Sequence, residues 1–157
     1  MKKYLFTCVF YSFFCINLHA VDFGTKEEAE NMLERAVNII KLDKSMALEL
    51  FAEGEGGFNY KDLYPFCYHV PTGMMYSHPT FTGLSREKSV AEGVNVADLI
   101  INNAEEDEIG SVNIKIARLT TGDKKIYDKT LLITKVDDLA CGVGYYKKWS
   151  ALIVDSI

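Results

Sequence analysis

The side chains able to do chemistry are few in this chain of 157 residues, and their spacing fits no catalytic or metal-binding motif. Cys67 and His69 are two positions apart, so on a β-strand they share a face and could form a nucleophile and its base. Alternation along a buried strand explains the same pair without catalysis. The sequence also lacks Cys-x-x-Cys, His-x-x-x-His and nucleophile-elbow spacings. We therefore expect no enzymatic activity, no metal site and no cofactor.

The segment from Asp62 to Pro79 has the pattern of a β-hairpin that positions these groups. Two aromatic-rich stretches flank Pro71-Thr72-Gly73, where proline presets φ and glycine tolerates positive φ. In the first stretch, Cys67 and His69 alternate with aromatic and apolar residues, so the two sets face opposite sides of the strand. The apolar set consists of Tyr64, Phe66, Tyr68 and Val70. One side of the hairpin can therefore pack against a core.

The first twenty residues have the composition of a secretory signal peptide. Lys2 and Lys3 form a basic start, Tyr4 to Leu18 is nearly uncharged and apolar, and Leu18-His19-Ala20 fits a cleavage site. The apolar stretch is shorter than the roughly 20 residues that a membrane-spanning helix needs, so we expect cleavage, with an uncleaved anchor as the alternative. We therefore expect a periplasmic or secreted protein.

Residues 21–157 have the length of one domain with an adequate core. The formal net charge of the whole chain is −5, and loss of residues 1–20 makes it more negative, because that segment carries two lysines and no acidic residue. Nucleic acids and anionic membranes select basic surfaces. We therefore expect no nucleic-acid partner.

A long helix and an antiparallel sheet are predicted along this domain. Thr25-Lys-Glu-Glu28 matches a capping box, and apolar residues recur at steps of three and four as far as Ala52, which predicts one helix that the glycines from Gly54 to Gly57 end. The stretch from Thr80 to Gly93 lacks periodicity and is expected to be a loop, with room for one helical turn, that could lie over a pocket. A short helix begins after Asn95.

Strands follow in the C-terminal half. Residues 109–117 alternate between apolar and polar side chains, and two further strands are expected at 126–136 and 139–146. Together with the hairpin they predict an α+β domain built on one antiparallel sheet of five to six strands.

The hairpin and the last strand resemble the single Cache domain, a PAS-like extracytoplasmic sensor domain. The resemblance rests on Leu63 to Tyr68, Thr72-Gly73 and Ser77-His78-Pro79, and on Asp138 to Lys147 with its small residues and Gly-x-Tyr. It spans about Thr25 to Lys147. It implies a long N-terminal helix on a PAS-like sheet, which binds a small organic acid, amino acid or similar metabolite without turnover. It also implies a membrane receptor or kinase as partner.

The resemblance also implies a set of site residues. His78 matches the His-Pro pair at the end of the family's second strand, and Lys129 stands where a pocket-facing lysine often begins the fourth strand, so it could pair with a carboxylate. Tyr64, Tyr68 and Tyr76 could supply pocket walls and hydroxyl donors. The alternatives are an exposed strand lysine at Lys129 and tyrosines that only build the core.

Two points are left open by the sequence. In the family's sheet the first and last strands are neighbours, so Cys67 and Cys141 either form a disulfide or remain two buried thiols. The domain either binds a ligand or has lost its pocket and acts as an interaction module, with the helix from Thr25 to Ala52 as a homodimer or partner surface.

Overall fold

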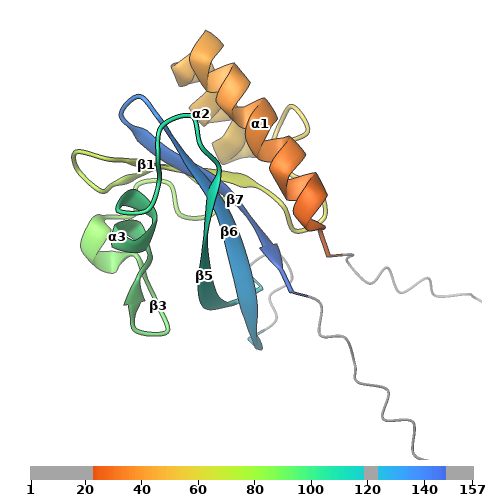
Figure 1. The fold of residues 1–157 in the computed structure, drawn as a ribbon, viewed down its shortest axis with the longest axis vertical. Coiled ribbons are helices and arrows are strands. Elements are labelled where there is room, and N and C mark those ends of the chain that lie inside the picture. Colours follow the sequence, from red (N-terminus) through yellow and green to blue (C-terminus); the bar gives the residue numbers. More distant parts are fainter. Residues whose placement is uncertain (1–22, 119–123, 148–157) are drawn as a thin grey trace, which may run out of the picture.

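A computed structural model describes residues 23–118 and 124–147 (Figure 1). The expected signal peptide lies outside the described residues. None of the helices within the described ranges is long and apolar enough to cross a membrane.

One antiparallel sheet of five strands forms the centre of the domain, with the strand order β2-β1-β7-β6-β5. The first and last strands of the sequence order, β1 and β7, are direct neighbours. The expected α+β fold class is confirmed. The strands are β1 (Pro65–His69), β2 (Met75–Ser77), β5 (Gly110–Ala117), β6 (Ile126–Val136) and β7 (Leu139–Tyr146).

The N-terminal helical segment consists of two helices, α1 (Lys26–Leu42) and α2 (Lys44–Glu53). The capping box is present, since Glu28 N donates to Thr25 Oγ1 at 3.1 Å and Thr25 N donates to Glu28 Oε2 at 2.8 Å. The positive φ of Gly54 ends α2, as the glycine run predicted.

The prediction of a single helix from Thr25 to Ala52 was wrong. Asp43 has extended φ and ψ of −153° and 97°, and its carboxylate accepts a hydrogen bond from Met46 N at 3.0 Å. An aspartate that caps a new helix in this way competes with continuation of the old one. The break lets α2 leave the axis of α1 and pack over β1 and β2.

Two layers cover the two faces of the sheet (Figure 1). On one face α1 and α2 pack on β7, β6 and β1, and on the other lie α3 (Val96–Ile101) and the short strands β3 (Val90–Ala91) and β4 (Val94–Asn95). The alternation of each strand divides its residues between the two layers. On β6, for example, Leu132 belongs to the helix-side core and Leu131 to the opposite one.

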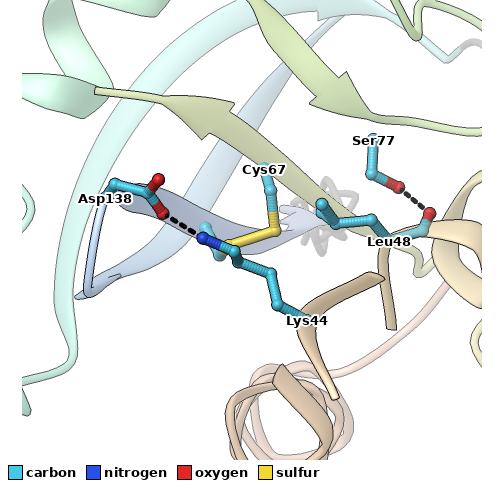
Figure 2. Close-up of a disulfide and its surroundings, with 6 residues drawn as sticks. Lys44, Leu48, Cys67, Ser77 and Asp138 are labelled. Carbon is cyan, nitrogen blue, oxygen red and sulfur yellow. Dashed lines mark hydrogen bonds and ion pairs between the residues drawn. A yellow bond between two sulfur atoms is a disulfide. The ribbon is translucent and has the colours of Figure 1, made fainter. Parts of the chain in front are cut away.

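A disulfide joins the neighbouring strands β1 and β7 on the helix side (Figure 2). Cys67 and Cys141 are paired directly in the ladder, and neither is exposed. Two hydrogen bonds beside them attach α2 to the sheet: Lys44 Nζ donates to Asp138 at 2.8 Å, and Ser77 Oγ donates to the Leu48 carbonyl at 2.8 Å. This side of the sheet is therefore closed by covalent and polar links as well as by apolar packing.

Candidate functional site

A cavity of about 300 Å³ lies on the face of the sheet that α1 and α2 leave free. Its floor comes from β1, β5 and β6, and its cover from α3 and the segment between β2 and α3. Phe81 and Leu84 of that segment line it, as expected for a loop that lies over a pocket. A cavity of this size is at the lower end of those that hold small ligands.

The polar end of the cavity is built around Lys129 on β6. Its side chain is 4% exposed, and Nζ lies 3.0 Å from the Tyr64 hydroxyl. The same Nζ lies 4.6 Å and 4.7 Å from the ring centres of Tyr64 and Tyr146. An ammonium over aromatic faces is stabilised by the ring quadrupole. Two tyrosine rings therefore hold the lysine in place.

Gly144 on β7 makes this position of Lys129 sterically allowed. A Cβ added at Gly144 would lie 2.4 Å from Cε of Lys129 and 2.6 Å from Cδ2 of Leu131. Any larger residue would push the lysine from its place between the rings.

Burial sets the protonation chemistry of Lys129 and Tyr64. Loss of solvation lowers the pKa of Lys129, while the hydrogen bond and charge of Tyr146 and the charge of Asp62 act in the opposite direction. Burial, together with the charge of Asp62, raises the pKa of Tyr64 above its usual value. The Tyr64 hydroxyl is therefore protonated at physiological pH and able to donate.

His78 contributes a third polar group to the cavity wall. Its Nδ1 accepts hydrogen bonds from Thr80 N at 2.9 Å and Phe81 N at 3.2 Å, so the proton of the neutral ring is assigned to Nε2. Burial, with a smaller effect of the charge on Lys129, lowers the pKa of His78 to about 3. The imidazole is therefore neutral at physiological pH and presents an N–H donor.

These three groups form a site rich in donors. Lys129 Nζ, the Tyr64 hydroxyl and His78 Nε2 all carry hydrogens, and the rings of Tyr64 and His78 are only 4.9 Å apart between centres. The nearby carboxylate of Asp62 accepts from Gly24 N at 2.7 Å and from Arg118 Nε at 2.9 Å. Since that carboxylate does not line the cavity, the arrangement suits an anionic oxygen and does not suit an ammonium group.

Four of the five residues predicted for the pocket line this cavity, and Tyr76 does not. Tyr64, Tyr68, His78 and Lys129 are all buried in its wall, which excludes the alternative of an exposed lysine at position 129. The ring of Tyr76 is 39% exposed and stacks on His69 at 4.5 Å between centres. Tyr76 points away because side chains alternate along β2, and the preceding residue, Met75, lines the cavity. His78 lines the cavity as well because it lies beyond the end of the strand, where this alternation no longer applies.

The structure does not form the nucleophile pair that Cys67 and His69 could have made. The sulfur of Cys67 is in the disulfide, and His69 Nδ1 lies 2.8 Å from Thr72 Oγ1. Within the described ranges no group of three or more His, Cys, Asp or Glu side chains could hold a metal ion.

Sequence reasoning missed several residues of the site. Tyr146 and Gly144 are on the cavity side of β7, and their signal was the Gly-x-Tyr alternation of the last strand. Ser89, whose hydroxyl bonds the Tyr68 hydroxyl, lies in the segment without periodicity, so nothing in the sequence marked it. The ion pair between Asp62 and Arg118 joins residues 56 positions apart and also gave no local signal.

Comparison with known proteins defines the class of fold. No family model matches the sequence, and no curated protein matches it significantly. Among solved structures, the chain is similar to a methyl-accepting chemotaxis protein from Vibrio parahaemolyticus, with a TM-score of 0.58 and 20% identity over 77% of this chain and 87% of that one. It is also similar to a Cache chemosensory domain described for carboxylic acid recognition, with a TM-score of 0.51 and 17% identity over 76% and 86% of the two chains.

These similarities show that the chain has the fold of a Cache chemosensory domain, which is PAS-like. The Cache resemblance of the hairpin and the last strand is confirmed at the level of fold.

Proposed function

We propose that this chain is an exported sensor domain that binds a small carboxylate at Lys129 without chemical turnover. The observation that carries the proposal is the convergence of three hydrogen-bond donors, from Lys129, Tyr64 and His78, on the polar end of a cavity whose described lining residues include no carboxylate. A bound carboxylate would neutralise the buried ammonium of Lys129 and accept from the other two groups.

The neighbours of known structure support this proposal. One belongs to a chemotaxis receptor, and the other is a Cache domain described for recognising a carboxylic acid. A domain of this type would present its ligand state to a membrane receptor or kinase, after export directed by residues 1–20 and removal of that segment.

Thermal unfolding with a panel of small carboxylates, amino acids and amines tests the proposal. A ligand that binds only the native state at about 100 times its Kd should raise Tm by roughly 8 °C in a domain of this size. The shift should appear with carboxylates, disappear in Lys129→Met and persist in Lys115→Met, which removes a lysine that is 70% exposed on β5. A panel without any shift, or an equal shift in Lys129→Met, would overturn the proposal.

The alternative of a pocket-less interaction module has less support. Most apolar residues of helix α1 face the helix-side core, where Met32, Leu33 and Ile40 are each at most 3% exposed, whereas Leu42 at its end is 84% exposed. Homodimerisation through the segment from Thr25 to Ala52 would have to use its polar face together with Leu42 and Met46, which are its exposed large hydrophobic residues. Size-exclusion chromatography with light scattering over a range of protein concentrations measures the oligomeric state directly.

A further inference from the structure

The walls of the cavity beyond its polar end restrict the ligand further. We propose that the ligand is an aliphatic monocarboxylic acid whose hydrocarbon chain fills the cavity, with its carboxylate at Lys129 and its chain against Phe66, Ile100 and Leu131. This inference rests on the proposed function and adds the chemical class of the acid.

The charge of the wall favours a single carboxylate. Besides Lys129, the only charged residue among the described residues that line the cavity is Lys88, which is exposed to solvent. A cation in contact with solvent contributes little to the binding of an anion. A second carboxylate on the ligand would therefore lose its hydration without gaining a buried counter-charge.

The hydrogen-bonding groups of the wall lead to the same conclusion. Away from the polar end, the uncharged polar side chains of the wall are Tyr68 and Ser89, whose hydroxyls are bonded to each other. An α-amino group would instead lie beside Lys129 with no carboxylate to receive it, because no Asp or Glu is among the described residues that line the cavity. Amino acids should therefore bind much more weakly than the matching simple acids.

The remaining wall is apolar and buried. Ile100, Ile114 and Leu131 are between 1% and 7% exposed although they border open space, so each has side-chain atoms without a packing partner on the cavity side. Hydrocarbon placed against these side chains loses contact with water on that side and gains packing contacts. Each methylene that the cavity accepts should strengthen binding about fourfold.

Isothermal titration calorimetry with the saturated acids from acetate to decanoate tests this inference. Affinity should rise about fourfold per methylene and then level off once the chain has filled the cavity. Octanoate should bind at least about tenfold more tightly than octanedioate or 2-aminooctanoate, because a buried unpaired polar group costs roughly that much.

A variant that fills the cavity gives a second readout. Val96→Phe enlarges a half-buried wall residue at the start of α3, so it should shift the chain length at which affinity levels off to shorter acids while acetate binds as before. Val94→Phe is the matched control, since Val94 is 44% exposed on β4 and does not line the cavity. It should leave the whole series unchanged.

The outcomes separate this inference from the proposed function. If acetate binds in a Lys129-dependent way but affinity is flat along the series, or if octanedioate equals octanoate, the hydrocarbon-chain inference is wrong and the carboxylate site stands. If none of the acids binds, the proposed function itself fails.

Discussion

The two faces of the central sheet are built from the same strands and yet have opposite properties. On the helix side, Cys67, Leu132 and Cys141 are sealed under α1 and α2. On the other side, Leu131 and Lys129 border a cavity of about 300 Å³, and Gly144 contributes no side chain. Adjacent residues of one strand thus have different roles: those on the helix side stabilise the fold, and those on the other side form the wall of the cavity. The packing on the helix side can supply most of the stability of the domain. The opposite side can therefore contain a cavity and the buried charge of Lys129, both of which cost stability.

Removal of the disulfide should produce the largest loss of stability. The bond closes a loop with a sequence separation of 74, for which the loop-entropy relation gives about 4 kcal/mol. The variant Cys67→Ala/Cys141→Ala should therefore lose about 4 kcal/mol in chemical denaturation relative to the oxidised protein. Intact mass after alkylation, with and without reduction, checks the bond directly. Two alkylated thiols in the native, unreduced protein would contradict it.

Two neighbouring leucines on β6 allow the packing of the two faces to be compared with the same substitution. Leu132 and Leu131 are both 3% exposed, but only Leu131 borders the cavity. Leu132→Ala should cost about 3 kcal/mol, and Leu131→Ala about 1 kcal/mol less, because the side chain of Leu131 already lacks contacts on its cavity side. Urea denaturation of both variants measures the difference. Equal losses would show that the cavity side is packed as tightly as the helix side.

Acid should destabilise the cavity face through His78. Its folded pKa of about 3 is below its ordinary value of 6.5, so the unfolded state binds more protons between these values and stability falls as pH decreases from about 6.5 to 3. Between pH 7 and pH 4 this should contribute a loss of about 3 kcal/mol. The loss should be smaller in His78→Asn, which keeps an acceptor for Thr80 N and Phe81 N. His69→Asn removes an imidazole away from the cavity and controls for that change.

The two faces also differ in how much of them the sequence predicts. Local patterns predicted the capping box at Thr25 and the strand alternation, and the resemblance to the Cache domain predicted the neighbouring positions of Cys67 and Cys141. The break at Asp43 was missed because a helix N-cap within an apolar stripe is a weak signal.

The cavity is harder to predict because its shape depends on contacts between distant residues. That His78 lines the cavity and Tyr76 does not depends on where β2 ends, and the ion pair of Asp62 with Arg118 depends on the three-dimensional arrangement of two segments. The cavity exists because some positions carry no side chain and because residues far apart in the sequence come together around it. Neither feature produces a periodic pattern in the sequence.

The smallest expected change in stability should have a large effect on binding. Gly144→Ala places a methyl group 2.4 Å from Cε of Lys129, and the flexible end of the lysine can move aside, so the cost should be about 1 kcal/mol. The moved ammonium would no longer lie 3.0 Å from the Tyr64 hydroxyl, and carboxylate affinity should fall at least about tenfold. Gly110→Ala on β5 is the control, since its nearest neighbour would be an ordinary 3.7 Å away. If Gly144→Ala bound carboxylates as the native protein does, the exact position of Lys129 would be irrelevant to the site, and the contrast between the two faces would be one of packing alone.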